Sequence, residues 1–331
     1  MLTIIIPSFN SENFIQRCLD SIVTQKFSDW HVYIIDGGSH DKTKLICSAF
    51  INKAPKKISF ISLPQSKQGE ARNLGIDLTN TPYLTFIDSD DCYANEEVLS
   101  SLMKALDKVN TDFLCSSVRF LDSESNTLRV IGKFHSKFMY GSEIFIDALL
   151  ERNIHTIPWN KIYKTSFLKS NNIKFPNVRE QEDIYFSRIC SYYASCVQFK
   201  NLISVNGFIR GDSRSRSMSI RNLTSVNIIF NEINKHICKD KNFKLYLPFL
   251  RFSEARSLAY IIIIAASRID HFNVLLNFHR KITSKNLLNI PFSSKLFFRA
   301  KLISIISIYL SKFRLSLYVV RYLKKYFRFG Y

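Results

Sequence analysis

The chain has 331 residues, room for one large or two ordinary domains, and 46% of them are hydrophobic, which is enough for a packed core. Gly and Pro are scarce, at 9 and 8 residues, which excludes a collagenous or low-complexity protein. The seven cysteines form no C-x-x-C pair, which argues against a disulfide framework and a structural zinc site.

The formal net charge of +19 is unevenly distributed. No Asp or Glu follows Asp270, whereas residues 271–331 hold twelve Lys or Arg. Such a segment favours a polyanionic partner, either nucleic acid or an anionic membrane surface. The first residues contain no basic leader followed by a long apolar run, so we expect a cytoplasmic protein and not a secreted one.

Over the first 120 residues, short apolar runs alternate with segments of helical periodicity. The predicted strands are 2–6, 32–35, 58–62, 83–87 and 112–119. The predicted helices are 13–23, 43–51, 70–78 and 95–109. This alternation predicts an α/β fold with a mainly parallel sheet, in which ligands bind outside the carboxyl ends of the strands.

The second half of the chain has a different pattern. Residues 120–220 are irregular, with a predicted turn at 159–161 and an acidic cluster near 180–183. From about residue 223 the pattern is helical to the end. Neither 258–266 nor 302–320 has the roughly 20 apolar residues that a membrane span needs. A basic amphipathic helix at a membrane surface fits the C-terminal pattern better.

Three carboxylates lie within residues 88–91, directly after the predicted strand 83–87. Because like charges this close repel, a cation is the simplest way to keep them ionised, and oxygen ligands suit Mg²⁺ or Mn²⁺. The alternative is a solvated turn that caps the helix predicted at 95–109.

Three further segments each have a chemical and a structural interpretation. The 36–41 turn, with two glycines, permits close approach of a ligand or is an ordinary turn. Arg72 could meet a diphosphate or form a surface salt bridge. Glu182 and Asp183 could supply a general base for an acceptor hydroxyl, or an acidic helix N-terminus.

Taken together, these segments resemble the family 2 glycosyltransferases, the inverting group with the GT-A fold. The resemblance covers about residues 1–220. The segments that match the family, in its order, are its opening strand (4–10), the segment before strand two (21–25), the D-D-G-S-T-D turn (36–41), the A-R-N-x-G helix start (71–75), the D-x-D motif (88–91), the W-N-K-L-Y-R segment (159–164) and the E-D motif (182–183). Two positions depart from the family pattern, with Gly37 in place of the second Asp and His40 in place of Thr.

The resemblance implies a GT-A domain over 1–220, a Rossmann-like, mostly parallel sheet with flanking helices. For residues 221–331, which the resemblance does not cover, the helical pattern and the basic charge predict a helical, basic region that associates with a membrane. The resemblance also implies roles for individual residues. The expected nucleotide contacts are Pro7, Ser8, Phe9 and Asp36 at the base, Arg72 at the base or the diphosphate, and Lys161 and Arg210 near the phosphates or the acceptor. Asp88 would hold the ribose or assist at the metal, Asp90 would bind Mn²⁺ or Mg²⁺, and Asp183 would be the base with Glu182 as its orienting neighbour.

The implied reaction is hexosyl transfer from a nucleotide donor, expected to be a UDP-sugar, to a glycan or an undecaprenyl-linked acceptor. The expected setting is O-antigen, capsule or lipopolysaccharide assembly at the inner face of an anionic membrane. The alternative is a basic nucleic-acid- or membrane-binding protein without transferase activity. No zinc finger, helix-turn-helix or aromatic-basic RNA-binding motif supports a nucleic-acid partner. A sugar nucleotidyltransferase would need a Gly-rich, arginine-bearing N-terminal loop, which is missing. The sequence leaves the sugar and the oligomeric state open.

Overall fold

The structure is a computed structural model that describes residues 1–106, 110–209 and 220–265. The chain divides into two compact units, Met1–Arg210 and Gly211–Tyr331, and each is described by itself. The predicted contact residue Arg210 and the basic segment 271–331 lie outside the described residues.

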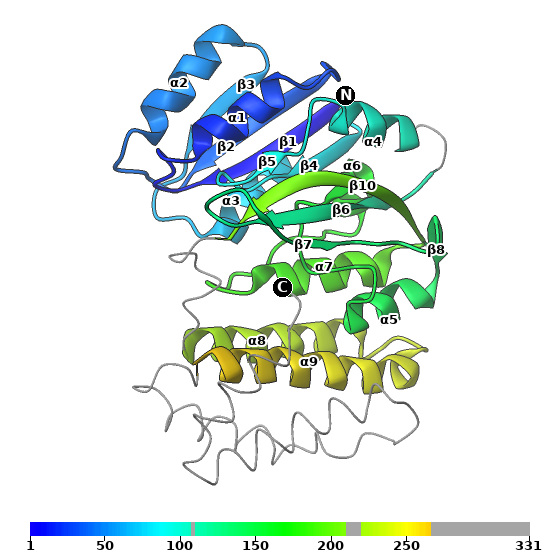
Figure 1. Cartoon of the computed structure of the whole chain (residues 1–331). Coiled ribbons are helices and arrows are strands. Elements are labelled where there is room, and N and C mark those ends of the chain that lie inside the picture. Colours follow the sequence, from blue (N-terminus) through cyan, green and yellow to red (C-terminus); the bar gives the residue numbers. More distant parts are fainter. Residues whose placement is uncertain (107–109, 210–219, 266–331) are drawn as a thin grey trace. The chain divides into compact units, whose positions relative to one another are not determined.

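The first unit is a sheet with helices on both faces (Figure 1). Its strands are β1 (Leu2–Ser8), β2 (Trp30–Asp36), β3 (Ile58–Ser62), β4 (Tyr83–Phe86), β5 (Cys92–Tyr93), β6 (Phe113–Leu121), β7 (Thr127–Ile131), β8 (Phe138–Tyr140), β9 (Lys161–Lys164) and β10 (Cys196–Phe208). Its helices are α1 (Ile15–Val23), α2 (Thr43–Lys53), α3 (Gln68–Leu78), α4 (Val98–Leu106), α5 (Ser142–Leu150), α6 (Thr165–Ser170) and α7 (Glu182–Tyr193).

The sheet order is β3-β2-β1-β4-β9-β6-β10-β5, with β7 on β6 and β8 on β10. The first four strands are parallel, which confirms the predicted α/β half. The structure then adds β9, which runs antiparallel between β4 and β6, so the complete sheet is mixed. Lys161 belongs to this strand, and the turn predicted at 159–161 is therefore wrong at its last residue. The helix predicted at 95–109 begins only at Val98, so Asp91 does not cap it.

The two faces of the sheet carry different helices. From β1 to β2 to β3 the chain moves outward across the sheet, and the two connecting helices α1 and α2 lie side by side on one face. From β3 the chain crosses back to β4 on the other side of β1, and the connecting helix α3 lies on the opposite face (Figure 1). Helix α7 lies on the α3 face, where the ring of Phe186 stacks on Phe175 with centroids 3.9 Å apart. Phe86 of β4 packs edge-on against both rings. This aromatic cluster joins helix α7, which carries Glu182 and Asp183, to the central strand β4.

The register of the parallel strands brings their carboxyl ends together. Ser8 at the end of β1 pairs with Asp36 at the end of β2, and the N–H of Ile87 donates to Ile5 O at 3.1 Å, so Asp88 follows on the other side of β1. The predicted ligand-binding edge is therefore formed by three adjacent strand ends.

The second unit contains the helices α8 (Ile220–Ile237) and α9 (Phe243–Ala265), which contact each other, and α8 has a buried apolar stripe. The buried α8 residues are Val226, Ile229, Phe230, Ile233 and Ile237. Within the described part of the chain, no helix has the length and apolar character that crossing a membrane requires.

Candidate active site

The turn after β2 is built around the carboxylate of Asp36, which is only 3% exposed. Its Oδ2 accepts hydrogen bonds from the N–H groups of Gly38 and Ser39 at 3.1 and 2.8 Å, and its Oδ1 accepts one from Ser39 Oγ at 2.5 Å. Gly38 has φ +93°, a left-handed conformation that favours glycine. The Asp-Gly-Gly-Ser pattern therefore shapes the turn itself, and the Asp36 carboxylate is buried within it.

The exposed residue Phe9 and the loop after β3 lie next to this turn. The ring of Phe9 is 47% exposed, although it follows the fully buried strand β1. The loop after β3 is tied to the turn by hydrogen bonds from the N–H groups of Leu63 to Asp36 O and of Gln65 to Gly37 O. The hydroxyls of Ser8 and Ser66 are buried and have no hydrogen-bond partner among the described residues. The three residues predicted at the base, Pro7, Ser8 and Phe9, thus stand beside Asp36.

The carboxylates of Asp88, Asp90 and Asp91 form a cluster whose ligand atoms all lie within 4.8 Å of one another. Asp88 and Asp90 are half-buried, and Asp91 is buried. Burial and the neighbouring charges of Asp90 and Asp88 raise the pKa of Asp91 well above its ordinary value. Crowded carboxylates of this kind are a suitable oxygen donor set for Mg²⁺ or Mn²⁺, and the geometry fits the predicted metal site.

Arg72 of α3 joins this cluster to the start of α7. Its Nη2 donates to Asp88 Oδ1 at 2.7 Å, and its Nη1 donates to Glu182 Oε1 at 2.8 Å. Arg72 does form salt bridges, but its side chain is only 3% exposed, so the alternative of a surface salt bridge is wrong. Gln68, one helical turn earlier on α3, also donates to Asp88 Oδ1, at 3.2 Å. Gln68 is not among the residues predicted for the site, although its i, i+4 spacing from Arg72 places it on the same helix face.

Asp183 lies half-buried in the first turn of α7, next to Glu182. Burial and the charge of Glu182 raise the pKa of Asp183 to about 7, against the opposing effect of Arg72. A carboxyl group with such a pKa is suited to exchange a proton near neutral pH. The structure thus connects the acidic pair of α7, through Arg72, to the carboxylates that follow β4.

Lys161 is placed differently from these residues. It is 2% exposed, and its Nζ donates to His155 O at 2.8 Å, to Ile157 O at 2.5 Å and to Asn160 Oδ1 at 2.7 Å. The ammonium group therefore donates three hydrogen bonds, all to the segment that precedes β9. The donor-binding role expected for Lys161 stays a prediction, and the hydrogen bonds of its side chain indicate a structural task.

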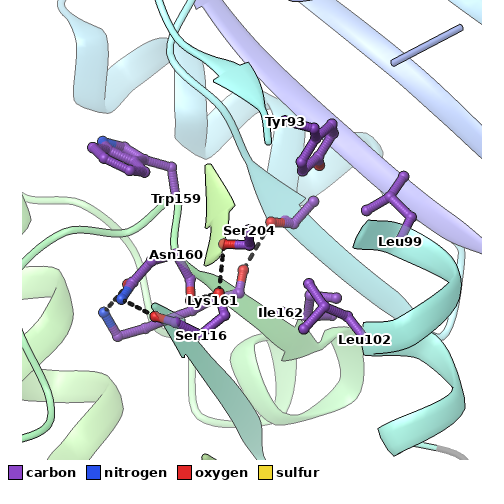
Figure 2. A pocket seen from close by; sticks show the side chains of 10 residues that line it. Tyr93, Leu99, Leu102, Ser116, Trp159, Asn160, Lys161, Ile162 and Ser204 are labelled. Carbon is purple, nitrogen blue, oxygen red and sulfur yellow. Dashed lines mark hydrogen bonds between the residues drawn. The ribbon is translucent and has the colours of Figure 1, made fainter. Parts of the chain in front are cut away.

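Figure 2 shows the side chains that line a small cavity beside Lys161, contributed mainly by β4, β5, β6, β9, β10 and α4. Its volume is about 10 Å³, comparable to a single water site. Ser116 Oγ lies 2.6 Å from Ser204 Oγ, and Asn160 Nδ2 donates to Ser116 O at 2.9 Å (Figure 2). Since it is too small for a sugar or a nucleotide, this cavity is part of the packed interior.

The residues 3–171 match the family model described as Glycosyl transferase family 2, and the chain belongs to this family. Family membership favours the transferase interpretation of the site over the nucleic-acid-binding alternative.

Among similar proteins is the poly(ribitol-phosphate) beta-N-acetylglucosaminyltransferase TarS of Staphylococcus aureus, 29% identical over 188 residues. The match covers 56% of this chain and 31% of TarS, so the chain matches less than a third of that relative. The crystal structure of TarS 1-349 in complex with UDP-GlcNAc has a TM-score of 0.57 at 21% identity and covers 87% of this chain and 89% of that one.

A second solved structure shares the fold. It is a mannosyltransferase from Pyrobaculum calidifontis in complex with GDP-Man and Mn²⁺, with a TM-score of 0.52 at 15% identity. The match covers 92% of this chain and 86% of that one. Both structures support the GT-A type of α/β fold that the sequence predicts.

Proposed function

We propose that the chain transfers a sugar, with inversion, from a nucleoside diphosphate donor to a hydroxyl group of an acceptor. The observation that carries this proposal is the connection Asp88–Arg72–Glu182, which links the first turn of α7, where Asp183 lies, to a cluster of carboxylates after β4. A proton acceptor with a pKa of about 7 and a cation-binding cluster are the two parts that such a transfer needs.

In the proposed reaction, Asp183 accepts the proton of the acceptor hydroxyl while that oxygen forms a bond to the anomeric carbon. The bond from this carbon to the donor diphosphate breaks, and its electron pair leaves with the diphosphate oxygen. Asp88 and Asp90 would hold Mn²⁺ or Mg²⁺, which when bound offsets the negative charge of the diphosphate. The turn at Asp36 and the exposed ring of Phe9 would receive the nucleobase.

For the donor we propose a UDP-sugar, and for the acceptor a glycan or lipid-linked glycan of a bacterial surface polymer. The donor proposal is supported by the UDP-GlcNAc in the TarS structure, and the setting by the poly(ribitol-phosphate) substrate in the name of TarS. Action at the inner face of an anionic membrane would match the net charge of +19.

The proposal is tested with purified protein, Mn²⁺ or Mg²⁺ and a panel of nucleotide sugars, by measuring release of the nucleoside diphosphate and formation of glycoside. Asp183→Asn removes the proton acceptor at nearly constant shape, and we expect a loss of activity of about 10³-fold. Asp20→Asn, which removes an exposed carboxylate on α1, is the matched control and should keep full activity. Full activity of Asp183→Asn would remove the assignment.

A further inference from the structure

Arg72 is enclosed between two carboxylates that come from distant parts of the chain. Both of its terminal nitrogens donate to them, at 2.7 Å to Asp88 and 2.8 Å to Glu182, and its Nε is buried as well. A guanidinium group is planar and rigid, so two carboxylates bound to its two terminal nitrogens are held at a fixed separation and orientation. In this state the side chain of Arg72 is only 3% exposed, so little of it is accessible to a nucleotide.

Helix α3 holds the base-bearing segment at two further points. The side-chain amide of Asn73 forms two hydrogen bonds with the backbone of Phe175, from Nδ2 to the carbonyl at 2.9 Å and to Oδ1 from the N–H at 2.8 Å. At Gly69, an added Cβ would lie 3.1 Å from Phe175 Cβ and 3.3 Å from Glu182 Cγ. The absence of a side chain at Gly69 therefore lets the segment 175–182 lie directly on α3.

We infer that Arg72 is a positioning residue, which holds Glu182 and thereby Asp183 at a set distance from the metal-binding carboxylates. This role differs from the nucleotide contact that the family resemblance implies for Arg72. The kinetic part of the inference rests on the proposed transferase function, whereas its structural part does not.

The charges around Asp183 give a second readout. Besides burial, the charge of Glu182 raises the pKa of Asp183, whereas Arg72 lowers it; the buried Lys161 also interacts with this carboxylate. Loss of the Arg72 cation should therefore raise the pKa of Asp183. A base that must be ionised would then act only at higher pH.

The structural test compares amide hydrogen exchange in the wild type and in Arg72→Gln. We expect exchange of the amides of 178–184 to become at least about tenfold faster in Arg72→Gln, because the segment loses its ionic contact with α3. Lys174→Gln is the matched control: it removes an exposed cation that lies before this segment and pairs with Asp77 at the other end of α3, and it should leave exchange at 178–184 unchanged. Unchanged exchange in Arg72→Gln would overturn the inference.

The kinetic test separates positioning from nucleotide binding. For Arg72→Gln we expect kcat to fall about 100-fold, the KM for the UDP-sugar to change less than about threefold, and the acid limb of the kcat profile to move up by about one pH unit. Arg72→Lys keeps the charge but cannot hold two carboxylates, so its acid limb should stay near that of the wild type while kcat remains low. A tenfold higher KM with unchanged kcat and acid limb would make Arg72 a nucleotide ligand and overturn the inference.

Two further comparisons keep these tests decisive. Arg72→Gln leaves the buried carboxylate of Glu182 without its cation, and the single variant could fail to fold for that reason. The double variant Arg72→Gln/Glu182→Gln removes this unpaired charge, so it replaces the single variant in the exchange test in that case. It should show the same faster exchange at 178–184, and wild-type exchange would count against the inference. If the wild type itself transfers no sugar from any donor of the panel, the proposed function fails, and the exchange comparison alone decides the role of Arg72.

Discussion

The carboxylate of Asp91 accepts a hydrogen bond from the backbone N–H of Phe208 at 3.1 Å, which ties the loop after β4 to the end of β10. The same loop is held from the other side by Arg17, whose Nη2 donates to Asp90 O at 2.7 Å and whose guanidinium lies 3.5 Å from the centre of the Phe208 ring. Of the three clustered carboxylates, Asp91 thus has a structural contact that accounts for its burial.

This contact predicts opposite results for two substitutions. Asp91→Ala leaves the Phe208 N–H without its acceptor, and we expect a loss of about 1–3 kcal/mol of unfolding free energy. Asp91→Asn keeps an acceptor oxygen and removes a charge that Asp88 and Asp90 repel, so it should be at least as stable as the wild type in metal-free buffer. Urea unfolding of the three proteins with a chelator present measures both effects. Equal stability of the two variants would contradict the structural role.

Much of the N-terminal half could be predicted from local pattern, because each strand–helix unit buries its own apolar residues. The strand predicted at 58–62 has the bounds of β3, and the helices predicted at 13–23 and 70–78 end where α1 and α3 end. The strand β9 could not be predicted in this way. It has only four residues, two of them lysines, and exists because β4 and β6 pair with it on either side.

The sequence was enough to predict the types of residue that form the candidate site, but not which of them contact one another. Three carboxylates in four residues mark the loop after β4, and the acidic pair marks α7. That Arg72 contacts both groups depends on the packing of α7 against α3, which joins residues 110 positions apart. The hydrogen bonds of Lys161 were likewise hidden, since their backbone acceptors carry no side-chain signature.

Divalent metal should stabilise the folded chain through the carboxylates of Asp88 and Asp90. We expect Mn²⁺ or Mg²⁺ to raise Tm by about 2–4 °C for each kcal/mol of binding free energy gained by the folded state, and a chelator to reverse the rise. Asp90→Ala should abolish this shift, whereas Asp20→Asn, with its exposed carboxylate on α1, should retain it. An undiminished shift in Asp90→Ala would place the ion elsewhere.

The raised pKa of Asp183 predicts a pH dependence of stability. The folded state keeps this proton up to a pH of about 7, whereas the unfolded chain loses it near the ordinary pKa of 3.8. Between these pH values the unfolded state binds fewer protons than the folded state, so the free energy of unfolding decreases as the pH rises. The stabilisation that Asp183 provides is fully present below pH 3.8 and is lost as the pH rises through 7. In metal-free buffer, Asp183→Asn should therefore gain stability over the wild type on going from pH 5 to pH 8, by about 1 kcal/mol or more. Parallel unfolding curves of the two proteins across this range would contradict it.

Lys161 offers a test of structure against donor binding. Lys161→Met retains much of the buried length but leaves the carbonyls of His155 and Ile157 and the amide oxygen of Asn160 without their donor. We expect the unfolding free energy to fall by about 1–3 kcal/mol, since unsatisfied buried acceptors are costly. Lys164→Met, at the exposed end of the same strand, should cost less. A Lys161→Met protein of normal stability with a raised donor KM would instead support the phosphate contact expected from the family.

Gly75 lets α3 lie close to β1, and this contact sets the position of Arg72 one turn earlier on the same helix. A Cβ at Gly75 would lie 2.5 Å from Cγ2 and 2.9 Å from Cγ1 of Ile5, which is fully buried. Helix propensity alone would make Gly75→Ala stabilising by about 1 kcal/mol, whereas overpacking costs about 1–3 kcal/mol, and we expect a net loss of stability. Transfer activity should fall as well, because the displaced helix carries Arg72 away from Asp88.

The double variant Ile5→Ala/Gly75→Ala opens the space that the new methyl group needs, so its loss of unfolding free energy should be smaller than the sum of the losses in the two single variants. Additive losses in this double-mutant cycle, measured by urea unfolding, would show that Ile5 does not restrict the approach of α3.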